Sequence, residues 1–446
     1  MTAPLVVAIS GQIAGTLAQH RTGRLELTYE NGYVEAPSAT PLSVSLPLRE
    51  RVHSGRAVQS WLANLLPDNP RVLDRWAGQF QVSASNPFAL LRHVGRDVAG
   101  AVQFVPENAV DSLLIGGVVP LSEQALVRRI DEVIADPAAW TPLAGAGQFS
   151  LPGAQPKLAL RLDPSGWGKP WGNEATTHIL KPPMVGFGHQ ELNEHLSLVL
   201  ARYAGLPAAH SRVLQVGPHR VVCVSRYDRT RDGDTVTRIH QEDLCQALGV
   251  PPTRKYQADG GPGAVDVIGL LNRVLPPAEA ADQVGSFLRA LAFAWVTVGT
   301  DAHAKNYSLL LAGREIALAP LYDLNSALPC RDGQLRFSRP GRITGQPATL
   351  AMSIGGKGRL DEITGRDWAR LASQAGLDPE TVASAVADVV ELIAPGVEAV
   401  VNAELDQGGC NDERVGFART FQTRIQQRAA QCQLLLRNRT PRHRYR

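Results

Sequence analysis

Asp301-Ala-His-Ala-Lys-Asn306, with Tyr322-Asp323 after a short hydrophobic hairpin, is the most informative feature of this 446-residue chain. It places one Asp, an Asn five residues on, and then a second Asp. Enzymes that transfer phosphoryl groups use such a set: the first Asp accepts the proton of the attacking hydroxyl, and the Asn and second Asp hold Mg²⁺. Asp301 is therefore the candidate catalytic base, and Asn306 and Asp323 are the candidate metal ligands.

The sequence on either side of Asp301 strengthens this interpretation. Residues 284–298 are largely apolar, which is typical of a buried helix, and such a helix would hold Asp301 at a rigid loop. Mg²⁺ takes only one or two carboxylates beside phosphate oxygens, which fits this sparse set. An Asp and an Asn at this spacing also occur by chance, so a capping Asp with a turn Asn remains the alternative.

The composition excludes several other classes of protein. Hydrophobic residues make up 44% of the chain and charged residues 20%, as in ordinary globular proteins. No uninterrupted apolar run is long enough for a transmembrane helix, and the N-terminus lacks the basic start of a signal peptide. The five cysteines include no C-x-x-C pair, which argues against a disulfide framework or a zinc site and favours a reducing cytoplasm.

The net charge of +3 depends on the C-terminus, because residues 437–446 contain five arginines and removing them leaves +3 − 5 = −2. Such a tail would attract nucleic acid phosphates. A frayed, solvated terminus is the favoured alternative.

The order of segments predicts an α+β, two-lobed protein-kinase-like fold with an extra N-terminal module. Residues 1–107 are expected to form an α+β module, residues 108–226 a β-rich lobe, and residues 227–446 a mainly helical lobe. ATP would lie in the cleft between the lobes. The expected strands include 5–9, 25–29, 158–162, 177–181 and 221–224, and the expected helices include 191–203, 284–298, 381–393 and 411–436.

Lys181 ends the predicted strand His178-Ile-Leu-Lys181, just before Pro182-Pro183. Kinases place a Lys on such a strand, where its ammonium contacts the ATP phosphates and pairs with a carboxylate of the next helix. Glu194 is the expected partner, with Glu191 as the second choice.

Two further segments are expected to contact ATP. The loop Ser150-Leu-Pro-Gly-Ala-Gln-Pro-Lys157 precedes a strand, so its backbone N–H groups and Lys157 could hold phosphates, although an ordinary turn is the alternative. Val224-Ser-Arg-Tyr-Asp-Arg229 follows the last strand of the β-rich lobe, where a kinase has its hinge. The predicted ATP contacts are Pro152, Gly153, Ala154, Gln155, Pro156, Lys157, Lys181, Ser225, Arg226, Tyr227, His303, Lys305, Asn306, Tyr322 and Asp323.

Together these segments resemble the HipA family, the serine/threonine kinase toxins of bacterial type II toxin–antitoxin systems. The resemblance covers nearly the whole chain. The matching stretches are Leu46-Pro-Leu, Asn64-Leu-Leu-Pro-Asp68, Gly100-Ala-Val-Gln103, Phe149 to Lys157, His178 to Pro182, Ser225 to Arg229, His240 to Gly249, Lys255-Tyr-Gln-Ala-Asp-Gly-Gly-Pro-Gly263, Thr300 to Asn306 and Tyr322-Asp323.

The resemblance implies an ATP- and Mg²⁺-dependent protein serine/threonine kinase of the toxin type. It implies that Ser150 is autophosphorylated, and that this modification expels the loop from the site and inactivates the enzyme. The implied substrates include aminoacyl-tRNA synthetases, whose phosphorylation arrests growth. The implied partner is a DNA-binding antitoxin of the HipB type, which represses the operon.

Two positions and one loop depart from the family pattern. Pro156 replaces an acidic residue, and Ser225 replaces a Glu, which leaves only main-chain contacts at the hinge. Lys357 and Arg359 occupy a basic loop that can reach operator DNA in the family, but it carries less charge here. The alternatives to a toxin kinase are a non-toxic kinase on the same scaffold and a catalytically silent co-repressor.

Overall fold

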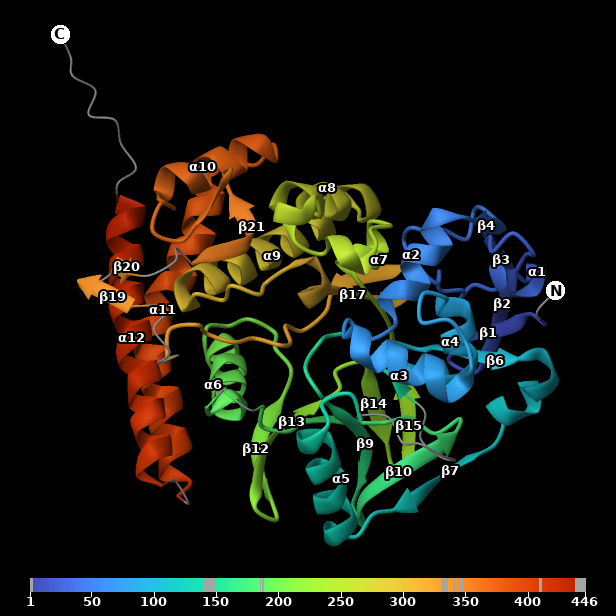
Figure 1. The fold of residues 1–446 in the computed structure, drawn as a ribbon. Helices are drawn as coiled ribbons and strands as arrows, with labels where there is room; N and C mark the ends of the chain where they lie inside the picture. The colour runs from blue at the N-terminus through green and yellow to red at the C-terminus, as the bar shows by residue number, and fades with distance from the viewer. Residues whose placement is uncertain are drawn as a thin grey trace. The chain divides into compact units, whose positions relative to one another are not determined.

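The computed structural model describes residues 3–139, 149–184, 186, 188–329, 336–339, 342–344, 348–408 and 411–437 (Figure 1). The chain divides into two units. The first comprises Met1–Phe187, His210–Arg254 and Ser308–Ala319, and the second comprises Gly188–Ala209, Lys255–Tyr307 and Pro320–Arg446. The three-part division expected from the sequence stays a prediction, and the arginine tail beyond Arg437 lies outside the described residues.

The N-terminal part of the first unit is an antiparallel sheet covered by helices. Its strand order is β4-β3-β2-β1-β6. Asn69 and Asn86 each cap a helix whose first residue is proline, so the side chain accepts a backbone N–H while proline needs no partner. The elements are β1 (Leu5–Ile9), β2 (Gln12–Gln19), β3 (Leu25–Tyr29), α1 (Asn31–Val34), β4 (Val52–Ser54), α2 (Arg56–Asn64), α3 (Pro70–Phe80), α4 (Pro87–Val94), β5 (Asp97–Val98) and β6 (Val102–Pro106).

A second sheet of six strands, in the order β12-β13-β11-β9-β10-β7, follows in the same unit. Its neighbours pair antiparallel throughout. The central strand β11 carries Lys181 at its end, which confirms the strand predicted there. The elements are η1 (Glu107–Leu113), β7 (Gly116–Pro120), α5 (Glu123–Ala135), β8 (Phe149–Ser150), β9 (Leu158–Asp163), β10 (Gly166–Gly172), β11 (His178–Lys181), β12 (Ser211–Val216) and β13 (His219–Ser225).

The first unit also contains two hairpins, one over residues 229–238 and one over residues 308–318. The predicted hairpin after Asn306 is confirmed: β17 (Ser308–Ala312) pairs antiparallel with β18 (Glu315–Leu318), and β16 (His240–Asp243) joins on the other side. The remaining elements are β14 (Arg229–Asp232), β15 (Thr235–Arg238), α7 (Leu244–Ala247) and η2 (Pro252–Arg254).

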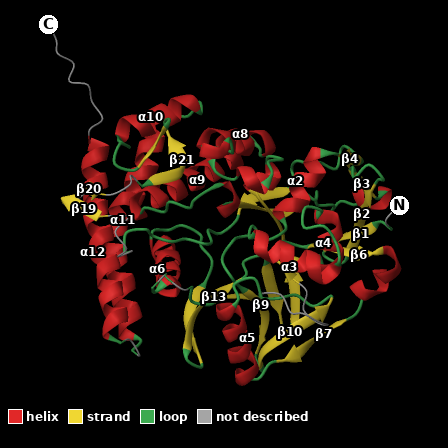
Figure 2. Ribbon diagram, viewed as in Figure 1, coloured by secondary structure: helices red, strands yellow, loops and turns green. Residues whose placement is uncertain are grey.

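The second unit is mainly helical (Figure 2). Helix α9 is buried along most of its length, as its apolar sequence predicts, and Trp295 near its end is fully buried. In the described part of the chain, no helix is long and apolar enough to cross a membrane. The elements are α6 (Gln190–Tyr203), η3 (Gln257–Asp259), α8 (Ala264–Val274), α9 (Pro277–Thr297), η4 (Ala304–Asn306), β19 (Arg336–Arg339), β20 (Arg342–Thr344), β21 (Thr349–Ile354), β22 (Lys357–Arg359), α10 (Gly365–Gln374), α11 (Pro379–Asp406) and α12 (Asp412–Arg437).

Candidate active site

The loop that carries Asp301 begins where α9 ends. Val298 closes the helix in the left-handed region, with φ of 57°, and its N–H donates to the Ala294 carbonyl. A β-branched residue rarely adopts this conformation, and such strain concentrates at functional sites. The turn directs the chain out of the buried helix, so that Asp301 follows a rigid element.

The Asp301 carboxylate is exposed but held in place. Its side chain is 62% exposed. Oδ1 accepts a hydrogen bond from the Tyr256 hydroxyl and lies 3.8 Å from Nε2 of His303. The Tyr256 and His303 rings pack edge to face, with centroids 4.8 Å apart. One carboxylate oxygen is therefore fixed by a neutral donor, while the side chain as a whole stays exposed and able to accept a proton.

Asn306 closes the same loop. Its Nδ2 donates to the Asp301 carbonyl over 2.7 Å, and its backbone N–H donates to the His303 carbonyl. Because a carbonyl can only accept, the amide nitrogen faces Asp301 and Oδ1 faces away from it. Asn306 therefore presents a hard oxygen, the kind of ligand that Mg²⁺ prefers.

Asp323 is held near this loop by its neighbour. The Tyr322 hydroxyl donates to the Lys305 carbonyl over 2.7 Å, and Lys305 directly precedes Asn306. Leu321 exchanges backbone hydrogen bonds with Pro207 and Ala209, both of 2.8 Å. Hydrogen bonds of Leu321 and of Tyr322 thus fix the two residues that directly precede Asp323.

Asp323 itself adopts a positive φ of 54°. Asp and Asn tolerate this left-handed conformation better than other residues with side chains. The predicted ligand set of one amide oxygen and one carboxylate fits Mg²⁺, which keeps most of its remaining ligands as water and phosphate oxygens.

A side-chain clamp joins this segment to two helices of the second unit. Asn193 of α6 donates to the Ser326 carbonyl over 2.8 Å and accepts from the Ser326 N–H over 2.9 Å. The Ser326 hydroxyl donates to the carbonyl of Thr297, the last residue of α9, over 2.6 Å. These hydrogen bonds therefore attach the segment after Asp323 to the end of α9, the helix that precedes Asp301.

Lys181 and its predicted partner Glu194 belong to different units. Lys181 is buried at the end of β11 in the first unit, whereas Glu194 is fully buried on α6 in the second. Their ion pair, and the second choice of Glu191, stay predictions. Glu191 itself lies 3.4 Å from Nη1 of Arg414 on α12.

The predicted phosphate loop packs against the N-terminal module. Ser150 is fully buried, and its hydroxyl donates to the Leu65 carbonyl over 2.7 Å. The Asp68 N–H donates to the Gly153 carbonyl over 3.1 Å. Strand β8 pairs in parallel with β5 through Asp97–Phe149 and Val98–Ser150. In this structure the loop is therefore docked with Ser150 turned inward.

Lys157 folds back over its own loop. Its Nζ donates to the Pro152 carbonyl over 2.5 Å. Gly153 has a φ of +107°, and a Cβ there would lie 2.6 Å from Nζ of Lys157. Only glycine allows both this conformation and the close approach of the ammonium group.

The predicted hinge is followed by a buried cluster of charges that sequence reasoning missed. Arg226 contacts Asp228 at 2.7 Å and 3.0 Å and Asp97 at 3.4 Å, and Arg229 contacts Asp97 at 2.9 Å. Burial alone would raise the pKa of Asp228, but the Arg226 and Arg229 guanidinium groups outweigh burial and hold that pKa well below its usual range. The cluster ties the N-terminal module to the hinge.

This cluster changes how the hinge residues could read a nucleotide. The Ser225 N–H donates to the His210 carbonyl over 2.8 Å, and the Arg226 N–H donates to the Thr177 carbonyl over 2.9 Å. The Tyr227 hydroxyl is bonded to Oε1 of Gln241. Any nucleotide contact by Ser225 or Arg226 would therefore have to use a main-chain carbonyl or the Ser225 side chain.

The two predicted DNA contacts lie on the β21–β22 hairpin beside acidic residues. Lys357 Nζ lies 3.2 Å from Glu362, and Arg359 lies 3.0 Å from Asp361. These exposed pairs cancel much of the local positive charge. DNA contact by Lys357 and Arg359 stays a prediction.

Tyr256 is the residue of this site that sequence reasoning did not single out. It lies in the segment Lys255-Tyr-Gln-Ala-Asp-Gly-Gly-Pro-Gly263, which the resemblance covers but which has no spacing relation to Asp301. The Ala304 N–H also reaches the Lys255 carbonyl, over 3.4 Å. The segment thus supports the catalytic loop from outside it.

Comparison with known proteins gives matches along most of the chain. Residues 149–396 match the model of the HipA-like C-terminal domain, and residues 5–105 match the HipA N-terminal domain. Putative kinase Y4mE of Sinorhizobium fredii is 36% identical over 404 residues, covering 89% of this chain and 91% of that protein. Serine/threonine-protein kinase toxin HipA of Shewanella oneidensis is 32% identical over 303 residues, covering 65% of this chain and 67% of that protein.

A solved structure agrees with these matches. The complex of Shewanella oneidensis HipA, HipB and operator DNA contains a chain that matches with a TM-score of 0.82 and 25% identity, covering 98% of this chain and 99% of that one. The prediction of an α+β, kinase-like fold is confirmed. With both domain models matched and similarity extending over nearly its whole length, the chain belongs to the HipA family of kinase-like proteins.

Proposed function

We propose that this chain is a protein serine/threonine kinase that transfers the γ-phosphoryl group of ATP to a hydroxyl of a cellular protein. The Asp301–Asn306 loop carries the proposal. It combines an exposed carboxylate, held at one oxygen by Tyr256, with an amide whose nitrogen donates to the Asp301 carbonyl and whose oxygen faces away from that carbonyl. The relatives named as kinases support the same activity.

In the proposed step, Asp301 accepts the proton of the substrate hydroxyl while the hydroxyl oxygen bonds to the γ-phosphorus of ATP. The bond from that phosphorus to the bridging oxygen breaks, and ADP leaves with its electron pair. Asp301 then returns the proton to water. Asn306 and Asp323 would hold Mg²⁺, which when bound neutralises the charge of the phosphates.

The remaining contacts with ATP are proposed from both units, each taken separately. In the second unit, Lys305 and Tyr322 are linked through the Tyr322 hydroxyl, and His303 packs on Tyr256. In the first unit, Lys157 and Lys181 supply the positive charges that phosphates need.

Autophosphorylation of Ser150 is proposed as the regulatory event. Ser150 is fully buried with its hydroxyl on the Leu65 carbonyl. A phosphoryl group would add a charge of about −1.5 to −2 at this point. Because a charge of that size is costly to bury without cationic partners, the modified loop would have to leave its place beside β5.

The proposed partners are a DNA-binding antitoxin of the HipB type and, through it, operator DNA. The similarity to the HipA chain of a complex with HipB and operator DNA supports this assignment. Aminoacyl-tRNA synthetases are the proposed substrate class, with growth arrest as the outcome.

Incubation with γ-labelled ATP and Mg²⁺ tests the kinase proposal. Wild type should incorporate label at Ser150, and Asp301→Asn should lose about 10²- to 10⁴-fold of the rate, as expected when a general base is removed. Asp282→Asn, at an exposed position of α9, is the matched control and should label like wild type. Equal labelling of Asp301→Asn would refute the assignment of the base. No label on wild type that binds ATP would favour the silent co-repressor.

A further inference from the structure

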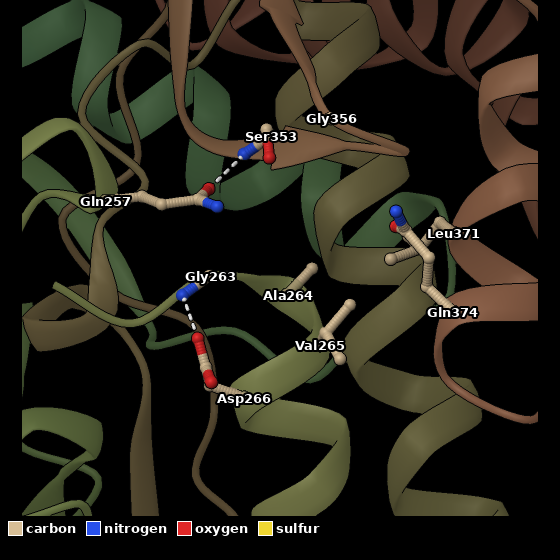
Figure 3. Close-up of a pocket in the computed structure, with 9 residues that line it drawn as sticks. All are labelled: Gln257, Gly263, Ala264, Val265, Asp266, Ser353, Gly356, Leu371 and Gln374. Atoms are coloured by element: carbon tan, nitrogen blue, oxygen red, sulfur yellow. Dashed lines mark hydrogen bonds between the residues drawn. The ribbon is translucent and has the colours of Figure 1, made fainter. Parts of the chain in front are cut away.

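A pocket of about 350 Å³ lies in the second unit, beside the segment that holds Asp301 (Figure 3). We call it the α8–α10 pocket. It is lined by Gln257, Gly263, Ala264, Val265, Asp266, Ser353, Gly356, Leu371 and Gln374.

The walls of the α8–α10 pocket come from three sides. Ala264 and Val265 at the start of α8 face Leu371 and Gln374 of α10, and Gln257 lies across from them beside β21 (Figure 3). The apolar part is thus a short cleft between two helices, and the polar part is a row of amide and hydroxyl groups.

A hydrogen bond holds the Gln257 side chain in place, so this wall of the pocket has a defined structure. Gln257 Oε1 accepts from the Ser353 N–H over 2.7 Å. A Cβ on Gly263 would lie 2.6 Å from Nε2 of Gln257, so glycine is what lets the amide lie against the start of α8. Gln257 then presents Nε2 as a donor beside the pocket.

Gln257 also connects the pocket to the proposed chemistry. It directly follows Tyr256, whose hydroxyl donates to Asp301. A chain bound along the pocket would therefore lie next to the segment that positions the catalytic base.

The chemistry of the lining selects the class of ligand. Asp266 supplies the one charged side chain among the described residues of the lining, and its Oδ2 accepts from the Gly263 N–H over 2.8 Å. A site with one negative charge and no cation repels nucleotides and nucleic acids. In the described part of the chain, the Ser353 hydroxyl and the Gln374 amide bond to no protein group, and both can donate and accept. These groups suit a polypeptide backbone, which offers both N–H and C=O.

The size and the exposure of the pocket agree with this class. A volume of about 350 Å³ is at the lower end of the range for small-molecule sites. Val265 is 39% exposed, and Asp266, Gly356 and Gln374 are exposed as well. The pocket is open along its rim, so it fits one side chain of a polypeptide that continues over the surface.

We propose that the α8–α10 pocket binds an apolar side chain of the protein substrate, in the segment that flanks the phosphorylated serine or threonine. This inference rests on the proposed kinase function. Asp266 at the rim would disfavour an acidic residue beside that side chain.

A positional-scanning library of fluorescent peptides, each with one central Ser or Thr, tests the proposal by binding to the full chain without ATP. Wild type should select an apolar residue at one flanking position and reject acidic residues next to it. Val265→Trp fills the pocket from an exposed position and should weaken binding of the selected pools at least fivefold. Gln374→Trp, on the opposite wall, should do the same and serves if the first variant fails to fold.

Asn272→Trp is the matched control, since Asn272 is exposed on the same helix but lies outside the lining. It should bind like wild type. Selection that is unchanged in both pocket variants overturns the proposal, as does a wild type that binds no pool. A second arm with ATP and Mg²⁺ measures phosphate transfer to the same pools. Intact selection without transfer would refute the kinase function and leave the docking site standing.

Discussion

The Tyr256 hydroxyl donates a hydrogen bond to Oδ1 of Asp301, and the carbonyl of the preceding Lys255 accepts from Ala304. Two groups of one segment thus hold both the carboxylate and the turn that follows it. Tyr256 does not touch the reacting atoms in the proposed mechanism. It is a positioning residue for the base, and its removal should change the rate of the chemical step more than the binding of ATP.

Tyr256→Phe should therefore lower kcat about tenfold or more, because a hydrogen bond to a charged group is worth about 1.5–3 kcal/mol. The KM for ATP should stay within about twofold, and the melting temperature should change little. The rate of Ser150 labelling at a series of ATP concentrations gives the maximal rate, taken as kcat, and the half-saturating ATP concentration, taken as KM. Tyr203→Phe, at a position 47% exposed, is the matched control. A kcat equal to that of wild type would exclude the positioning role.

Asp323→Asn removes the negative charge of the side chain and keeps a residue that tolerates the backbone conformation at position 323. Asn tolerates the φ of 54° as well as Asp does, so the loop should keep its shape. The loss of one negative oxygen should raise the Mg²⁺ concentration for half-maximal activity about tenfold or more. A titration of activity against Mg²⁺ at saturating ATP gives this value. Asn325→Asp, two residues on, adds a carboxylate outside the proposed ligand set and should leave the midpoint near that of wild type.

The sequence predicted those parts of the site that are local in the chain. The apolar run of α9, the Asp301–Asn306 spacing, the hairpin that follows, and the strand ending at Lys181 all appear as patterns within single short segments of the sequence. Periodicity and spacing capture such features. The edge strand β7 was not among the expected strands.

The contacts that sequence reasoning missed join residues far apart in the chain. Tyr256 meets Asp301 across 45 positions, and Asn193 meets Ser326 across 133. Nothing in the sequence indicated that Arg226 is buried, because arginine rarely is and because its partner Asp97 lies 129 positions away. Only tertiary packing brings such pairs together, so no period or spacing predicts them.

Ser150→Asp should release the phosphate loop, because it buries a charge where the structure has a hydroxyl bonded to the Leu65 carbonyl. Hydrogen–deuterium exchange should accelerate in residues 149–157 and at the end of α2. Ser150→Ala loses only one hydrogen bond, worth about 1 kcal/mol, and should keep the loop docked. Ser165→Asp, in an exposed turn, is the charge control. Slow exchange in Ser150→Asp would show that the loop accommodates the charge, and autophosphorylation would then need another way to inactivate the enzyme.

Glu242 makes the stability of the first unit depend on pH. Its carboxylate accepts from the Ser43 hydroxyl over 2.5 Å and from the Val44 N–H over 2.7 Å. Burial raises the pKa of Glu242 to about 8 against these hydrogen bonds, from an ordinary value of 4.5. Between these two values the folded state keeps a proton that the unfolded state has released. The free energy of unfolding should therefore fall as pH rises through this window, by up to about 1.4 kcal/mol per pH unit.

A second buried group has the opposite effect at lower pH. Burial lowers the pKa of His240 from 6.5 to about 4, so the folded state binds fewer protons than the unfolded state between these values. Its contribution to stability is lost as pH falls below 6.5. Below pH 6.5 the two groups change the free energy of unfolding in opposite directions as pH rises. Of the two, only Glu242 changes it between pH 6.5 and 8.

Glu242→Gln should remove the fall in the free energy of unfolding between pH 6.5 and 8. The Gln side-chain oxygen can accept from Val44, while its amide donates to the Ser43 hydroxyl, which can turn its proton toward the Gln246 carbonyl at 3.4 Å. Urea denaturation at pH 6.5, 7.25 and 8 should show the variant gaining stability over wild type at each step. Glu107→Gln, at an exposed position of the same unit, should run parallel to wild type. A constant difference between Glu242→Gln and wild type across this range would mean that Glu242 is already ionised in the folded chain at pH 6.5, and that the buried carboxylate is stabilised by Ser43 and Val44 alone.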